Sequence, residues 1–346
     1  MKTSSSALNL LWTAVLAATT ITNVSCFSTT PTKPTVVVYG IGQSSELTLL
    51  TSKMAAKEGW KSYCICSTDK EYACRNLMYG EDYAKAGNDD DFPMKAKPIH
   101  DGSSIQCALQ EATAIVFVGH DQPIDTSAIS MLVETAMEKD EDDGDDDDAA
   151  EFQPLSKVVY LSTMGITKKS GGGFFSGGGG GDPKIQQSET FLRDMISKAD
   201  SNVDLSIVRA GSLKGGGPGP NHQSDDHVEG IDDWGLCVRY YNTLINGVEA
   251  RVTMAHDKYT LGIGDGAITK GDTIEMPNKI KVMSTKTSTF DPLPYETNRI
   301  VAASAIMACI TGDKKGKDDV LEFSISGASG NQPPTLEEWN TVLQDL

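Results

Sequence analysis

Residues 35–45 read TVVVYGIGQSS, a β-branched apolar run that leads directly into a turn with two glycines and two serines. The run 35–39 predicts a buried parallel strand. Apolar residues recur at helical spacing from Leu47 to Ala55, which predicts a helix that ends near Gly59. The stretch therefore predicts a strand, a tight turn and a helix in direct succession.

The turn carries part of a G-x-G-x-x-G pattern, because Gly40 and Gly42 fill the first two positions and Ser45 takes the third. In this pattern glycine leaves the backbone open to a pyrophosphate, and the helix N-terminus supplies N–H groups and partial positive charge. The turn predicts a site for a nicotinamide dinucleotide, with a plain strand–helix turn as the alternative. The turn residues expected to contact the cofactor are Gly40, Ile41, Gly42, Gln43, Ser44 and Ser45.

Strand and helix patterns alternate along the first part of the chain. Strands are expected at 35–39, 62–66, 95–99, 114–118, 158–161 and 203–208, with helices at 103–111, 127–139 and 184–198 between them. This alternation predicts an α/β, Rossmann-like doubly wound parallel sheet with helices on both faces. Since parallel strands end at one edge, further cofactor contacts are expected from the residues that end them: Ser67, Gly119, His120, Ser162, Ala210 and Gly211.

The alternation fades after Gly211. Helices are expected at 233–248 and 296–310 and a strand at 320–325, and a capping-box pattern at Thr335 opens a short last helix. We predict a presequence over 1–34, an NAD(P)-binding core over 35–215 and a smaller C-terminal α+β lobe over 216–346, packed on the core. The core carries an acidic insert at 138–148 and a glycine-rich insert at 171–181.

Composition excludes several classes of protein. The chain has 346 residues, with 30 Lys and Arg against 48 Asp and Glu, for a formal net charge of −18. Such an acidic chain is not a general binder of nucleic acid. No apolar run of about 20 residues lies beyond the N-terminus, so stable membrane insertion of the mature chain is not expected. Seven cysteines without paired C-x-x-C spacing argue against a zinc module, and no metal site is predicted.

The N-terminus has the layout of a targeting segment. Lys2 precedes an apolar stretch from Leu8 to Ile21, and small residues follow up to Cys26, as in a cleaved secretory signal. Phe27 then opens a hydroxyl-rich stretch that resembles the bipartite plastid presequence of diatoms and related algae. The resemblance implies a plastid location reached through the secretory route, with plain secretion as the alternative.

The end of the second predicted strand leaves the choice between NAD and NADP open. An acidic residue there binds the ribose hydroxyls, whereas a basic residue binds the extra phosphate of NADP. Ser67 suits either cofactor, while Asp69 and Lys70 argue in opposite directions.

Several segments together resemble the atypical short-chain dehydrogenase/reductase family, in its NAD(P)H-binding, NmrA-like branch. The resemblance covers about residues 35–215 and implies a Rossmann-like fold with a nucleotide crevice above the strand ends. The matching segments are Gly40-Ile41-Gly42, Ala114 to Gly119, Val158 to Gly165, Glu189 to Arg193, and Leu205 to Gly211, where Ala210 replaces the usual Pro.

The family's active members use a Tyr and a Lys four residues later, at the start of the helix that carries Glu189, and often a Ser at the position of Ser162. The stretch 181–188 has no Tyr, and Lys184 stands one residue early. Tyr would be the proton donor to a carbonyl, so ordinary carbonyl reduction lacks its acid. Two hypotheses remain: an NAD(P)(H)-binding oxidoreductase-like protein with an unknown small-molecule substrate, or a non-catalytic Rossmann-fold protein that holds a protein partner in redox sensing or assembly.

Overall fold

A computed structural model describes most of the predicted core and part of the C-terminal region. The residues described are 33–41, 45–86, 95–120, 122–138, 154–167, 182–199, 202–214, 216, 235–236, 264–270, 296–312, 320–328 and 334–344. The predicted presequence (apart from Lys33 and Pro34), both predicted inserts (apart from Glu138) and most of the predicted helix at 233–248 lie outside these ranges. Gly235 and Leu236, the two described residues of that helix, are not helical.

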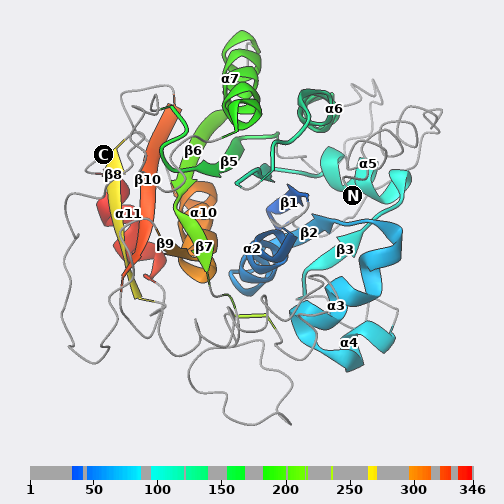
Figure 1. Cartoon of the computed structure of the whole chain (residues 1–346). Coiled ribbons are helices and arrows are strands. Elements are labelled where there is room, and N and C mark those ends of the chain that lie inside the picture. The colour runs from blue at the N-terminus through cyan, green and yellow to red at the C-terminus, as the bar shows by residue number, and fades with distance from the viewer. Residues whose placement is uncertain are drawn as a thin grey trace, which may run out of the picture.

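An eight-stranded sheet with the order β3-β2-β1-β4-β5-β6-β10-β8 forms the centre of the molecule (Figure 1). All neighbouring strands run parallel except β10 and β8. The order 3-2-1-4-5-6 is that of a doubly wound dinucleotide-binding sheet, so the predicted Rossmann-like class is confirmed. The strands are β1 (Thr35–Gly40), β2 (Lys61–Ile65), β3 (Lys97–Ile99), β4 (Ala114–Val118), β5 (Lys157–Thr163), β6 (Asp204–Ala210), β8 (Gly264–Lys270) and β10 (Val320–Ala328).

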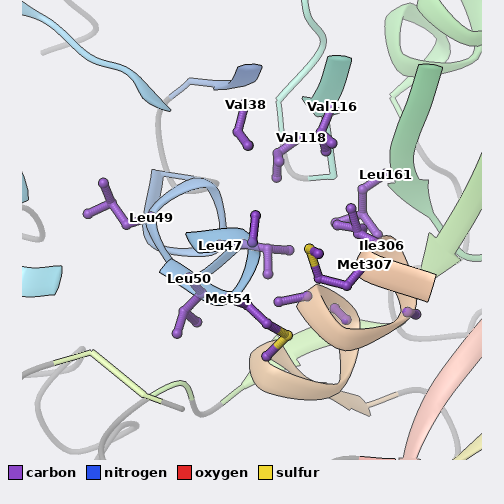
Figure 2. Packing of buried hydrophobic residues seen from close by; sticks show 14 of the residues in the cluster. Val38, Leu47, Leu49, Leu50, Met54, Val116, Val118, Leu161, Ile306 and Met307 are labelled. Atoms are coloured by element: carbon purple, nitrogen blue, oxygen red, sulfur yellow. The ribbon is translucent and has the colours of Figure 1, made fainter. Parts of the chain in front are cut away.

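Helices cover both faces of the sheet and bury two separate apolar clusters. One face carries α2 (Ser45–Lys57), α3 (Glu71–Tyr79), α4 (Glu81–Ala86), α10 (Arg299–Thr311) and α11 (Leu336–Gln344). The other carries α5 (Gly102–Gln110), α6 (Thr126–Met137) and α7 (Pro183–Lys198). Figure 2 shows the first cluster, where strand residues such as Val38 and Val116 point toward Leu47 of α2 and Met307 of α10.

Four of these helices begin at an Asp or Asn whose side chain accepts a hydrogen bond from a backbone N–H of the first turn. The acceptors and their donors are Asp101 and Ser104 N at 2.8 Å, Asp125 and Ser127 N at 2.9 Å, Asp182 and Lys184 N at 2.9 Å, and Asn298 and Ile300 N at 2.8 Å. These local caps explain why the sequence places the helix starts to within a few residues.

The C-terminal region contributes to the main sheet and core. β10 pairs in parallel with β6, and α10 is buried over nearly its whole surface beside α2. The helix expected to begin at 296 begins at Arg299, because Glu296–Asn298 form β9, which pairs with β7 (Ser212–Lys214). The predicted capping box of the last helix is confirmed, since Thr335 and Glu338 exchange hydrogen bonds of 2.8 and 3.2 Å.

Six of the described elements were not predicted from the sequence: the 3-10 turn Thr68–Lys70, α3, α4, β7, β8 and β9. Within the described ranges, no helix has the length and apolar character needed to cross a bilayer.

Candidate functional site

The carboxyl ends of β1, β4, β5 and β6 meet at one edge of the sheet. In register, Gly40 lies opposite Val118, and Thr163 lies opposite Ala210. The predicted site residues Gly119, His120, Ser162, Ala210 and Gly211 are therefore brought to this edge, and Ser67 follows the end of β2. Between β1 and β4 the strand order reverses, which is where open α/β sheets form a ligand crevice.

Gly40 is required by close packing at the end of β1. A Cβ on Gly40 would lie 2.2 Å from Thr48 Oγ1 of α2 and 3.0 Å from Val118 Cβ of β4. Because glycine leaves this space free, α2 approaches the strand closely and its N-terminus lies beside the crevice. Ile41 follows as described backbone, whereas Gly42, Gln43 and Ser44 lie outside the described ranges.

The first turn of α2 also contains an acidic side chain. Ser45 is the first residue of the helix, and Glu46 beside it is 1% exposed. A carboxylate in the first turn is stabilised by the helix dipole, but the same position is favourable for a pyrophosphate. The negative charge of Glu46 is therefore expected to weaken the attraction of this helix for an anionic cofactor.

Hydrogen bonds of His120 connect the carboxyl ends of β4, β5 and β6. Its Nε2 lies 2.6 Å from the carbonyl oxygen of Gly211 and 3.1 Å from that of Ala210, and its own carbonyl accepts a hydrogen bond from Thr163 Oγ1. Because both partners of Nε2 are acceptors, this nitrogen carries the proton. His120 is 3% exposed. Its ring is therefore buried and held in one orientation across the end of β5.

Ser162 is the hydroxyl that best suits a bound ligand. It is fully buried in β5, and its Oγ has no hydrogen-bond partner among the described residues. A buried hydroxyl without a partner is costly, so a ligand atom or a water molecule at this edge would satisfy it. This orphaned hydroxyl fits a cofactor that runs along the carboxyl edge.

The other predicted contacts have their backbone polar atoms engaged within the protein. The N–H of Gly119 donates to Leu161 O at 2.9 Å, and the N–H of Gly211 donates to Thr297 Oγ1 at 2.9 Å. The carbonyl of Ala210 accepts from Met164 N at 2.8 Å. These residues shape the edge, and any direct contact with a cofactor stays a prediction.

A tyrosine beside Gly119 explains why that position is glycine. A Cβ there would lie 2.3 Å from the hydroxyl of Tyr160 in β5. Burial raises the pKa of Tyr160, so its phenol stays protonated at neutral pH. Tyr39 at the end of β1 is also protonated at neutral pH, because burial and the charge of Asp125 raise its pKa to about 12.

These two phenols do not replace the missing catalytic pair. An acid of the Tyr-Lys type needs a tyrosine pKa lowered toward neutrality, whereas both phenols at this edge have raised values. The start of α7 holds Asp182, Pro183 and Lys184, with no tyrosine, as the sequence indicated. The remote candidates Tyr240, Tyr241 and Tyr259 lie outside the described ranges.

The end of β2 offers charges of both signs. Ser67 and Lys70 are partly exposed and Asp69 is exposed. Arg75 Nε of α3 donates to Glu71 at 2.9 Å, and the other Glu71 oxygen lies 3.2 Å from His100 Nδ1. The Arg75–Glu71–His100 group could not be predicted from the sequence, because only the fold brings α3 to the ends of β2 and β3.

Two of the segments that resemble the short-chain dehydrogenase/reductase family contain Glu189 and Arg209, which form a buried ion pair. Arg209 of β6 donates two hydrogen bonds to Glu189 of α7, at 2.7 and 3.2 Å, and a third to Glu322 of β10. Arg193 of α7 binds the other oxygen of Glu322 at 2.5 Å. These ion pairs connect α7 to β6 and β10. They therefore support the carboxyl edge of the sheet but do not contact the predicted cofactor site.

No family model and no curated protein sequence matches the chain. Solved structures give distant matches. A candidate NAD-dependent epimerase/dehydratase from Bacillus halodurans is 12% identical with a TM-score of 0.39, covering 90% of this chain and 99% of that one. UDP-glucose 4-epimerase from Bifidobacterium longum, in complex with NAD+ and UDP, is 12% identical with a TM-score of 0.41 and coverages of 88% and 81%.

The anaerobillin reductase ChuY from Escherichia coli O157:H7 is 11% identical with a TM-score of 0.36, covering 87% of this chain and 100% of that chain. At such identities and TM-scores these matches carry no conclusion, and function has to be inferred from this chain's own residues. Within the described part of the chain, no group of His, Cys, Asp and Glu side chains is arranged to hold a metal ion.

Proposed function

We propose that this chain binds a nicotinamide dinucleotide, NAD(H) or NADP(H), in the crevice between the carboxyl ends of β1 and β4. The supporting observation is the strand order 3-2-1-4-5-6 with the glycine Gly40 at the reversal point, where a side chain would collide with Thr48 of α2. That close approach brings the N–H groups of the first turn of α2 to the crevice.

The sequence pattern of the turn and the positions of the described strand ends indicate which residues would hold the cofactor. The turn 40–45 and the start of α2 would face the pyrophosphate, Ser67 the adenosine ribose, and Ser162 the nicotinamide half. When bound, the nicotinamide supplies a hydride donor or acceptor. The chain itself contributes the orphaned hydroxyl of Ser162 at that end, together with the fixed imidazole of His120.

Calorimetric titration of the full chain with NADPH and with NADH tests this proposal. We expect micromolar affinity for one of the two reduced cofactors, and loss of binding in Gly42→Asp with retained folding by circular dichroism. A matched control is Thr190→Asp, which adds the same charge on an exposed position of α7. Absence of heat up to millimolar nucleotide, or equal affinity in Gly42→Asp, would contradict the proposed site.

A second candidate is a nucleotide-binding protein that does not reduce carbonyl groups. His120 favours this candidate, because its Nε2 is already hydrogen-bonded to the carbonyl groups at the end of β6 and so serves a structural role. The absence of a tyrosine from the start of α7 favours it as well. This protein would keep the crevice and use the bound nucleotide to control a protein partner.

Turnover separates the two candidates. The full chain is incubated with NADPH or NADH and a panel of small aldehydes and ketones, and loss of the reduced nicotinamide absorbance is followed. The second candidate predicts binding without turnover. Sustained oxidation of the cofactor that depends on an added carbonyl compound would establish the oxidoreductase instead.

A further inference from the structure

Arg299 is the one charged residue of α10. The helix reads RIVAASAIMACIT, and all of its residues from Arg299 to Ile310 are buried. Arg299 itself is 9% exposed. A cation is unfavourable at the first position of a helix, because the helix dipole is positive there, and the burial of a charge adds a further cost. Neither helix formation nor apolar packing therefore explains a charged side chain at this position.

Hydrogen bonds fix the backbone that leads into Arg299. Thr297 Oγ1 accepts from Gly211 N and donates to Ile325 O, each at 2.9 Å. The side chain of Asn298 then caps α10. Gly211 follows the carboxyl end of β6, so these bonds place the start of α10 at the carboxyl edge of the sheet.

The start of α10 lies beside α2, which begins at the same edge after β1. The two helices pack against each other (Figure 2). Gly216 lies between them, because a Cβ on Gly216 would lie 2.9 Å from Leu50 Cδ1 and 3.3 Å from Arg299 Cβ. Leu50 is about one turn after Glu46 along α2. Since helical side chains lean toward the N-terminus of their own helix, the Arg299 side chain leans toward the level of the first turn of α2.

The charges at these two helix starts favour an anion. Glu46 is a buried carboxylate in the first turn of α2, and Arg299 is a buried guanidinium at the start of α10. Among these four groups the two side chains cancel, and two helix ends of about half a positive charge each remain. A pyrophosphate, with two negative charges, suits such a position.

Ser162 indicates independently that a ligand binds at this edge. Its hydroxyl is fully buried and has no hydrogen-bond partner among the described residues. Ser162 lies on β5, and α10 packs against both β5 and α2. A ligand that satisfies Ser162 and extends to the first turn of α2 would therefore run past the start of α10.

We propose that Arg299 binds the pyrophosphate of the dinucleotide, from the side of the crevice opposite the turn after β1. The inference rests on the proposed function, since it assigns a further binding residue to the same crevice. A guanidinium donates two parallel hydrogen bonds to phosphate oxygens, which an ammonium group does not reproduce. Because the start of α10 is fixed by Thr297 and Asn298, the backbone of Arg299 is in place before the cofactor binds.

Calorimetric titration of the full chain with NADPH and with NADH tests the role of Arg299. Arg299→Gln should weaken binding of the preferred cofactor about tenfold or more, because it removes charged donors to the pyrophosphate. The loss should shrink at high salt, which screens the charge. Arg299→Lys should recover only part of the affinity. The control Lys198→Gln removes the same charge from an exposed position of α7 and should bind as the wild type.

A purely structural role of Arg299 would give a different result. If the guanidinium only balances the charge of Glu46, Arg299→Gln would lower the free energy of unfolding in urea, and adding Glu46→Gln would restore it. The affinity of folded Arg299→Gln for the cofactor would then equal that of the wild type, which would overturn the proposal. Should Arg299→Gln not fold, Arg299→Lys decides, because wild-type affinity in that variant would also overturn it.

The wild type separates this inference from the proposed function. Failure of the wild type to bind either cofactor would refute the proposed function, and the role of Arg299 with it. Binding by the wild type with equal affinity in folded Arg299→Gln would refute only the role of Arg299. Inorganic pyrophosphate gives a second readout, since it should displace the cofactor from the wild type more effectively than from Arg299→Gln. Equal displacement from both would count against a phosphate contact.

Discussion

At the scale of single residues, the site depends on positions where a small side chain allows two elements to approach closely. Gly40 faces Thr48 and Val118, and Gly119 faces the hydroxyl of Tyr160. In the dinucleotide pattern the first glycine is associated with the tight turn. In this chain Gly40 also permits the contact between α2 and β1, so it is needed for folding as well as for the turn.

Gly40→Ala should destabilise the protein by about 1–3 kcal/mol, because the new Cβ would lie 2.2 Å from Thr48 Oγ1. Urea denaturation of Gly40→Ala, Thr48→Ala and the double variant measures this. The double variant should recover part of the loss, since removing Oγ1 leaves only the contact with Val118. Strict additivity of the two single changes would contradict the packing explanation.

Glu46→Gln should bind NADPH several-fold more tightly than the wild type. The substitution removes a buried negative charge from the first turn of α2, where the pyrophosphate is expected. Calorimetry at low and high salt measures the effect, which should shrink as salt screens the charge. Weaker binding in Glu46→Gln would mean that the carboxylate helps to form the site.

At the scale of elements, buried charge joins α7 to β6 and β10. Arg209 is fully buried and meets Glu189 and Glu322, while Arg193 binds Glu322 from the outer side. Burial by itself would lower the pKa of Arg209, but the charge and hydrogen bonds of Glu189 and Glu322 raise it. These bonds fix the helix over the strands whose ends carry Ser162 and Ala210.

Arg209→Met should destabilise the fold by about 3–5 kcal/mol, because it leaves Glu189 buried without its counter-ion. The matched control is Lys85→Met, which breaks a solvent-screened pair with Glu81 and should have a much smaller effect. Urea denaturation of both variants gives the comparison. Equal effects would show that the buried pair contributes no more than a surface pair.

Acid should weaken the same junction through Glu322. Burial would raise the pKa of this carboxyl, but Arg193 and Arg209 lower it below its ordinary value of 4.5. A lowered folded-state pKa adds stability above 4.5, and that stability is lost as the pH falls through the folded value. Glu322→Gln should therefore flatten the fall in unfolding free energy below pH 4.5. An unchanged slope in urea titrations over this range would contradict the assignment.

At the scale of the whole molecule, the parallel sheet collects side chains from distant parts of the sequence at one edge. Ser67, His120, Ser162 and Gly211 come from four separate strand ends. Hydrogen bonds within the protein stabilise this edge. His120 bonds to the carbonyl of Gly211 after β6, and the N–H of Gly211 donates to Thr297 just before α10. A cofactor would therefore bind to a preformed surface, which favours a small conformational change on binding.

The alternating elements and the capping box at Thr335 were predictable from the sequence, because each depends on local patterns of apolar and polar residues. The absence of a Tyr-x-x-x-Lys pair was equally visible, because it is a property of sequence spacing. The targeting role of residues 1–34 also comes from local composition, and it stays a prediction. The three-residue strands β7 and β9 escaped prediction because they are too short to show periodicity, and β8 escaped because its sequence GDGAITK lacks an apolar pattern.

Only the tertiary structure decided which polar groups meet. Nothing local indicates that the His120 ring bonds to the end of β6, or that Glu322 completes the ion pair of Arg209. These contacts join residues from different elements, so they depend on the order and twist of the strands. The class of fold therefore follows from local patterns, whereas the chemistry at the sheet edge follows from long-range packing.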